Sequence, residues 1–204
     1  MSEALNKDQV QPNPFAGRKN FTYKDYLNWP EDLRVEIING VAYMMSPPAT
    51  VHQRVSMQLS KIFANFLEEN PCEVFAAPFG VRLFPKEDHS DDTVVEPDIV
   101  VICDLNKIDE RGCNGPPDLV IEILSPSTSR KDRFQKLELY KKAKVREYWI
   151  VSPENREIEV NIFENNKINV YGKNDDDTPD DLKLPELAPV FILPGLEINL
   201  KEVF

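Results

Sequence analysis

Two acidic residues of this sequence stand in or beside apolar runs, where carboxylates are rare. Glu122 interrupts the apolar run 120–124, and Asp98 opens the apolar run 99–102. A buried carboxylate is costly unless a partner compensates its charge. If the two runs are neighbouring strands, the two carboxylates can converge, and a divalent cation between them would relieve their repulsion. Oxygen ligands of this kind favour Mg²⁺, with Mn²⁺ as a substitute.

The residue types leave other roles open for these acids. Glu122 could form a buried ion pair or reach solvent at the edge of a sheet. Asp98 could belong to a turn, because aspartate after proline is common in turns. Glu36 lies between two apolar residues, and it is either a third acidic metal ligand or the polar face of a hairpin.

A lysine falls on the apolar stripe of a predicted helix. Lys136 and Tyr140 are four residues apart on that stripe, and a lysine that points inward needs an anion such as Glu122. Such a lysine could orient or deprotonate a water molecule, or stabilise charge on a phosphate. Asp132, one turn earlier, would support Lys136 together with Tyr140. The alternative is a plain Asp132–Lys136 helix pair, worth about 0.2–0.5 kcal/mol.

His52 is the other side chain that could do chemistry. It opens the predicted helix 51–69 on its apolar stripe. A lone histidine in such a place is more often a hydrogen-bonded core residue than a catalyst. We therefore assign His52 a supporting role.

The elements that must position these residues can be read from the pattern. Asn39-Gly40 predicts a tight hairpin turn, and the runs 98–102 and 118–124 predict interior strands because they are apolar on both faces. The other predicted elements are a short helix at 22–29, the helix 51–69, strands within 73–84, a helix at 129–144, a strand at 146–153, a hairpin around 165–166 and a last strand at 195–200. We expect an α/β fold with a central mixed sheet flanked by helices.

Length and composition predict a single domain. The chain has 204 residues, of which 41% are hydrophobic and 29% charged, enough for one sizeable core. The polar, proline-bearing segment 1–20 reads as a flexible N-terminal tail, and 21–204 as the domain. Because no apolar stretch approaches the length needed to span a bilayer, we expect no membrane association.

Cysteine and histidine usage restricts the chemistry further. The three cysteines are Cys72, Cys103 and Cys113; an odd number without a Cys-x-x-Cys pair predicts no disulfide framework and a reducing bacterial cytoplasm. With only two histidines, a structural zinc site is not expected.

The charge is negative overall but unevenly distributed. A formal net charge of −11 argues against unselective coating of nucleic acid. However, the segment 130–146 holds eight basic and two acidic residues, so an anionic partner could dock on one face. The alternative is a solvated lysine-rich helix.

These residues together resemble a known family. "EPDIVVI" followed by "DLVIEILSPSTSRKDRFQKLELYKKAKVREYWIVSP" is similar to the Uma-type restriction endonucleases of the PD-(D/E)XK nuclease superfamily. "EIINGVAYMMSPPATVH" upstream and "LPGLEINLKEVF" at the end support the resemblance, which extends from about Phe21 to the C-terminus.

The resemblance implies a restriction endonuclease-like fold and divalent-metal hydrolysis of DNA phosphodiesters. Asp98 and Glu122 match the acidic motif positions, whereas Leu124 stands where the superfamily has its lysine. Lys136 is where this family places that lysine, so we expect Asp98, Glu122 and Lys136 to be catalytic. A homodimer is expected by analogy, because many enzymes that cut both strands pair two active sites.

Two other functions remain open, the first of them because the lysine is displaced and the protein is acidic. One is a catalytically silent nuclease-like module that binds DNA or a protein. The other is a metal-dependent hydrolase of smaller phosphoesters.

Overall fold

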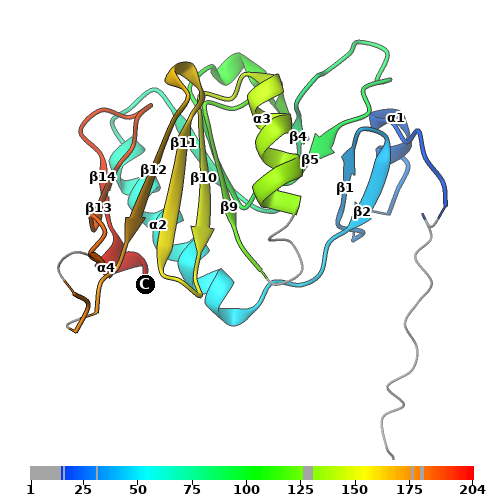
Figure 1. Cartoon of the computed structure of the whole chain (residues 1–204). Coiled ribbons are helices and arrows are strands. Elements are labelled where there is room, and N and C mark those ends of the chain that lie inside the picture. The colour runs from blue at the N-terminus through cyan, green and yellow to red at the C-terminus, as the bar shows by residue number, and fades with distance from the viewer. Residues whose placement is uncertain (1–14, 16, 31, 126–130, 176, 180–181) are drawn as a thin grey trace, which may run out of the picture.

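The centre of the fold is a six-stranded sheet with helices on both faces (Figure 1). The structure, a computed structural model, describes residues 15, 17–30, 32–125, 131–175, 177–179 and 182–204, with backbone alone at 131–133. The strand order is β12 (Lys167–Gly172), β11 (Glu157–Ile162), β10 (Glu147–Ser152), β9 (Leu119–Ile123), β6 (Ile99–Ile102) and β3 (Glu73–Ala76). Within this sheet, β9 and β10 pair in parallel and the other described pairs are antiparallel. The predicted mixed sheet is confirmed.

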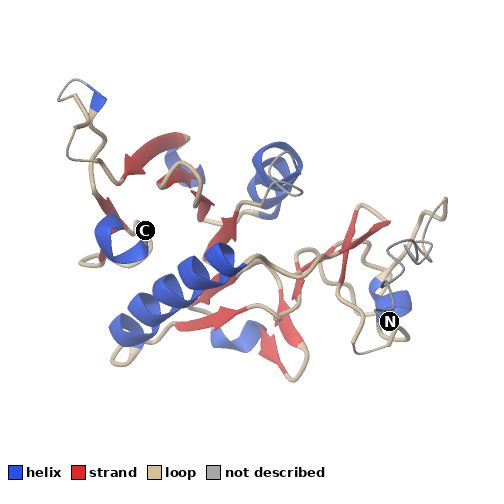
Figure 2. Ribbon diagram, turned by 90° about the horizontal axis from the view of Figure 1, so that it is seen from below, coloured by secondary structure: helices blue, strands red, loops and turns tan. Residues whose placement is uncertain are grey.

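Alternate residues of the central strands supply two separate cores. In β6 and β9, the odd-numbered residues pack against α2 (Thr50–Leu67) and the even-numbered apolar residues against α3 (Leu137–Ala143), as the two-residue period of a strand requires. Figure 2 shows α2 along one side of the sheet and α3, nearly end-on, on the other. Burial on both faces explains why the two strands are continuous apolar runs.

A second six-stranded sheet lies beside the first. Its order is β2 (Val41–Met44), β1 (Val35–Ile38), β5 (Val94–Val95), β4 (Val81–Arg82), β8 (Gly112–Asn114) and β7 (Ile108–Asp109). Asn39 and Gly40 have φ of 49° and 75°, which confirms the predicted β1–β2 turn. The sequence does not reveal the sheet as a whole, because strands of two or three residues carry no periodic signal.

The remaining elements are short. They are α1 (Tyr23–Tyr26), η1 (Leu105–Lys107), η3 (Phe163–Asn165), α4 (Leu200–Val203) and the pair β13 (Leu187–Pro189) and β14 (Glu197–Asn199). The helix predicted at 129–144 begins, within the described residues, as a π-helical segment η2 (Lys131–Lys136) that continues into α3. Single π-helical turns often occur at functional sites, and Lys136 is the last residue of this one.

The disulfide prediction was wrong. Cys72 and Cys103 are joined by a disulfide. The antiparallel register of β3 and β6 pairs Glu73 with Ile102, so the cysteines that flank this pair meet. Their sequence separation of 31 residues gives no sign of this pairing. The cysteines therefore no longer argue for a reducing compartment.

The N-terminal boundary stays a prediction, because residues 1–14 and 16 lie outside the described residues. Within the predicted tail, Phe15 is buried against Phe21 and Trp29. None of the described helices has the length and hydropathy that a membrane crossing requires.

Candidate active site

The two acids singled out in the sequence meet at the end of neighbouring strands. In the antiparallel β6–β9 pair, Ile99 lies opposite Ile121, so Asp98 and Glu122 are the next residues along the two strands, and both line one cavity. The backbone N–H of Ile123 donates to Asp98 Oδ2 at 2.7 Å.

His52 contacts the same oxygen of Asp98. His52 Nε2, from the first turn of α2, lies 3.2 Å from Asp98 Oδ2. His52 Nδ1 is buried and has no hydrogen-bond partner among the described residues. Asp98 Oδ1 makes no hydrogen bond to a described residue, and the side chain is 15% exposed. One oxygen of Asp98 is thus fixed by contacts from β9 and α2.

Glu122 is held by two donors from the helix that follows it. Lys136 Nζ and the Tyr140 hydroxyl donate to Glu122 Oε1 at 2.7 and 2.6 Å. Burial, and then the charge of Glu122, raises the pKa of Tyr140 well above its usual value, so this phenol remains a proton donor. Tyr140 therefore supports Glu122 directly, and its predicted support of Lys136 stays a prediction; the side chain of Asp132 lies outside the described residues.

Lys136 also bridges to the smaller sheet. Its Nζ is 2.7 Å from Glu36 Oε1, and the side chains of Lys136 and Glu36 are only 3% and 1% exposed. The backbone N–H of Glu96 donates to the same Glu36 oxygen at 3.2 Å. Glu36 thus faces inward as a partner of Lys136, and its role as a metal ligand stays a prediction.

Two further residues of this network were not singled out in the sequence. Arg34 Nε donates to Glu96 Oε1 at 2.8 Å, and the Arg34 Nη2 also contacts this oxygen. Their spacing in the sequence could have indicated them. Arg34 precedes Glu36 by two residues, and Glu96 precedes Asp98 by two. Residues two apart in an extended segment share a face.

A cavity of about 540 Å³ is lined by Arg34, Glu36, His52, Asp98, Glu122 and Lys136. Its walls come from the end of β2, the loop before α2, the first turns of α2 and the ends of β6 and β9. Lining residues from the loop and α2 include Met45, Pro47, Gln53, Ser56 and Met57. The volume is in the range of small-ligand sites, so the acids and Lys136 lie beside a space that can admit part of a substrate.

The donor set fits a hard divalent cation. Among the described residues that line the cavity, Glu36, Asp98 and Glu122 carry three formal negative charges against the one positive charge of Lys136, because Arg34 is matched by Glu96. Mg²⁺ is commonly bound through one or two carboxylates, with waters and substrate phosphates completing its octahedron. Within the described part of the chain, no group of three or more His, Cys, Asp or Glu is arranged to hold a metal. The fit therefore rests on Asp98 and Glu122.

The position of Leu124 shows how the lysine is displaced. Leu124 is half-buried and packs against the core beneath α3, so the strand offers no cation two residues beyond Glu122. Lys136 reaches Glu122 from η2 instead. The same carboxylate thus receives its cation from the next element along the chain.

Comparison with solved structures defines the class of fold. A crystal structure from Anabaena variabilis, described as "a putative nuclease belonging to DUF820", superposes with a TM-score of 0.70. The match covers 90% of this chain and 97% of that chain at 21% sequence identity. This chain therefore shares the α/β fold of that protein.

The sequence comparison then places the chain in a family. The Uma2 family model, described as "Putative restriction endonuclease", matches residues 23–196, and the chain belongs to this family. An uncharacterized protein of Synechocystis sp. is 29% identical over 170 residues, which is 82% of each chain.

Proposed function

We propose that the protein is a Mg²⁺-dependent endonuclease that hydrolyses phosphodiester bonds of DNA. The observation that carries this proposal is that Asp98, Glu122 and Lys136 line one cavity, with Lys136 bound to Glu122 at 2.7 Å. Asp98 and Glu122 would hold the metal, which when bound polarises a phosphate and lowers the pKa of a coordinated water. Mn²⁺ would substitute for Mg²⁺.

Lys136 acts in this proposal as a positioning cation. Its ammonium lies 2.7 Å from both Glu36 and Glu122, so it links the two carboxylates. It holds the Glu122 carboxylate toward the cavity, and it supplies positive charge near the negative charge that develops on a phosphate.

His52 and Tyr140 orient the two acids, Asp98 and Glu122, through direct contacts. Tyr140 orients Glu122 through its hydroxyl, and His52 supports Asp98. Contacts of this kind keep metal-binding carboxylates in a productive orientation. Both residues therefore have supporting roles.

The basic segment after β9 supports DNA as the substrate. The described lysines Lys141, Lys142 and Lys144 are exposed at the end of α3, where they can contact backbone phosphates without reading sequence. By the same proposal, a homodimer would bring two active sites to the two DNA strands. The enzyme would act in the cytoplasm.

A cleavage assay tests this function. Purified protein should convert supercoiled plasmid to nicked or linear DNA with Mg²⁺ or Mn²⁺, and not with EDTA. Glu122→Gln should lower the rate by at least about 100-fold. The control Glu68→Gln changes an exposed glutamate at the far end of α2 and should retain full activity.

Three outcomes would contradict the proposal. Equal cleavage by Glu122→Gln and the wild type would remove Glu122 from the site. DNA binding that persists in EDTA and falls with salt, without cleavage under any metal, would instead identify a catalytically silent binding module. Turnover of nucleotides or model diesters without plasmid cleavage would indicate a hydrolase of smaller phosphoesters.

A further inference from the structure

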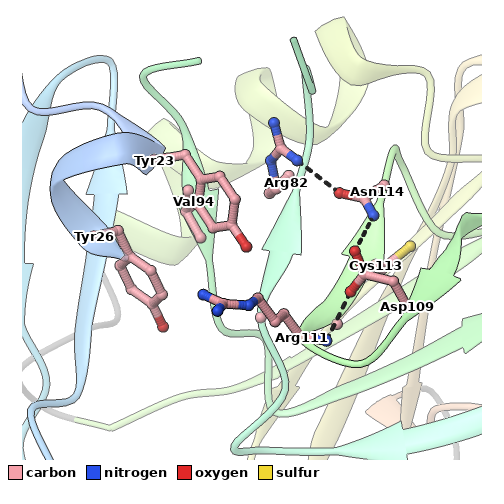
Figure 3. A pocket seen from close by; sticks show the side chains of 10 residues that line it. Tyr23, Tyr26, Arg82, Val94, Asp109, Arg111, Cys113 and Asn114 are labelled. Atoms are coloured by element: carbon pink, nitrogen blue, oxygen red, sulfur yellow. Dashed lines mark hydrogen bonds between the residues drawn. The ribbon is translucent and has the colours of Figure 1, made fainter. Parts of the chain in front are cut away.

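A second, smaller hollow lies between α1 and the β4–β8–β7 edge of the smaller sheet (Figure 3). Tyr23 and Tyr26 of α1 line one side, and Arg82, Arg111 and Asn114 line the other. Its interior volume is about 10 Å³, which is room for about one water molecule. A ligand would therefore be held at the open mouth.

Arg111 is presented by a rigid turn. Asp109 pairs with Gly112 in the β7–β8 hairpin, so Arg111 lies in a two-residue turn. Gly112 has φ of 137°, and a Cβ there would lie 2.1 Å from the Gly80 carbonyl oxygen, so only glycine is accommodated. The Arg111 N–H donates to Asp109 Oδ1 at 2.7 Å. The backbone that carries the guanidinium is thus fixed.

The neighbouring Arg82 has its charge satisfied. It donates to both carboxylate oxygens of Asp91 at 2.9 and 2.6 Å, and to Asn114 Oδ1 at 2.9 Å. Its guanidinium carbon lies 4.1 Å from the centre of the Tyr23 ring, a cation–π contact that holds this ring in place. Arg82 is therefore a support for the hollow.

The acid nearest to Arg111 is also satisfied by other donors. Asp109 accepts from the Arg111 backbone N–H at 2.7 Å and from Asn114 Nδ2 at 2.6 Å. The exposed Glu110 shares the turn, and Glu96, whose charge acts on Tyr26, is paired with Arg34. No carboxylate of a described residue pairs with the Arg111 guanidinium.

Three side-chain donors at the hollow lack partners. The Arg111 guanidinium and the hydroxyls of Tyr23 and Tyr26 make no hydrogen bond to any described residue. Figure 3 shows the Arg111 side chain extending toward the space between the two tyrosines, and the charge of Arg111 acts on Tyr23. Burial raises the pKa of both phenols, so they stay protonated at neutral pH.

We propose that this hollow is a binding site for a phosphate oxyanion, with Arg111 as the cation and Tyr23 and Tyr26 as hydroxyl donors. A guanidinium presents paired N–H groups that match phosphate oxygens, and two converging O–H groups can satisfy further lone pairs. The phosphate could belong to a nucleic-acid backbone or be free in solution. The site does not depend on metal binding or on cleavage.

The test uses Arg111→Gln and two probes in EDTA. Inorganic phosphate and a short DNA duplex are titrated separately into the full-length wild type and the variant by calorimetry. The affinity for at least one probe should fall about tenfold or more in Arg111→Gln. Tyr26→Phe, which removes only a hydroxyl, should weaken the same probe by a smaller factor. The matched control is Arg156→Gln, an arginine in the β10–β11 turn that is paired with Asp175.

Each outcome decides the proposal. A loss for the duplex alone identifies a nucleic-acid phosphate as the ligand, and a loss for inorganic phosphate identifies a free one. Unchanged affinity for both probes, or an equal loss in Arg156→Gln, overturns the site. Because the titrations contain EDTA, absence of nuclease activity would leave this result unaffected.

Discussion

Asp98 accepts the backbone N–H of Ile123 at 2.7 Å, so the carboxylate at the start of one strand is tied to the main chain beside Glu122 on the next. His52 lies 3.2 Å from the same oxygen. The separation of the two acids is thus set by the register of β6 and β9, and it does not depend on a flexible loop.

This geometry predicts that Asp98→Asn separates folding from metal binding. Asparagine keeps an oxygen that can accept the Ile123 N–H, so the free energy of unfolding in EDTA should change by less than about 1 kcal/mol. Loss of the charge should weaken Mn²⁺ binding at least about tenfold. Calorimetric titration of Mn²⁺ measures the affinity, and Glu68→Gln should bind like the wild type. Equal affinity in Asp98→Asn would contradict the assignment.

Lys136→Met should destabilise the protein strongly. It leaves the buried carboxylates of Glu36 and Glu122 without their shared cation, at a cost of about 3–5 kcal/mol. Adding Glu36→Gln should recover part of this loss, because one unpaired buried charge is removed. Urea unfolding in EDTA measures both variants, and the exposed Lys142→Met serves as control. A loss below about 1 kcal/mol in Lys136→Met would show that the bridge is not formed.

Tyr140→Phe removes one of the two donors to Glu122. The hydroxyl is buried and lies 2.6 Å from a carboxylate oxygen, so its loss should cost about 1.5–3 kcal/mol of unfolding free energy. Tyr171→Phe is the matched control, because the Tyr171 hydroxyl bonds to no described residue; it should change stability by less than about 0.5 kcal/mol. Equal effects of the two substitutions would show that the Tyr140 contact is not a stabilising one.

The sequence predicts the central half of this fold well, for a physical reason. β6 and β9 are buried on both faces, so each reads as an apolar run, and any charge in it stands out. The hairpin at Asn39-Gly40 and the helix α2 carry equally local signals, turn chemistry in one case and helical periodicity in the other.

Long-range pairing could not be predicted in the same way. The disulfide between Cys72 and Cys103 depends on the β3–β6 register. The Arg34–Glu96 pair joins residues 62 positions apart. Such contacts are set by tertiary structure, and a single sequence does not encode them in its local pattern.

Thiol titration tests the cysteine arrangement. Cys113 is buried, and burial raises the pKa of its thiol to about 11, while Cys72 and Cys103 are joined to each other. Because the thiolate is the reactive species, the folded, oxidised protein should show no reactive thiol toward a disulfide reagent. Unfolding without reductant should expose one thiol, and unfolding with reductant all three. Three reactive thiols in unfolded protein that was never exposed to reductant would contradict the disulfide.

Glu147 should make stability depend on pH. It is fully buried and accepts from Trp149 Nε1 at 2.7 Å and from the Ile192 N–H at 3.0 Å. Burial raises its pKa above the usual value, despite these hydrogen bonds. The folded state therefore binds this proton more tightly than the unfolded state, so Glu147 favours folding at low pH, and this contribution is lost as pH rises through the folded pKa.

The difference in unfolding free energy between the wild type and Glu147→Gln isolates this effect. Glutamine cannot titrate, and any cost of its amide beside the Ile192 N–H is independent of pH. The wild type should thus lose stability relative to Glu147→Gln as pH rises from about 4 toward neutrality. Urea unfolding at several pH values measures the difference, with the exposed Glu68→Gln as a control. A difference that stays constant or grows with pH would mean that the pKa of Glu147 is not raised in the folded protein.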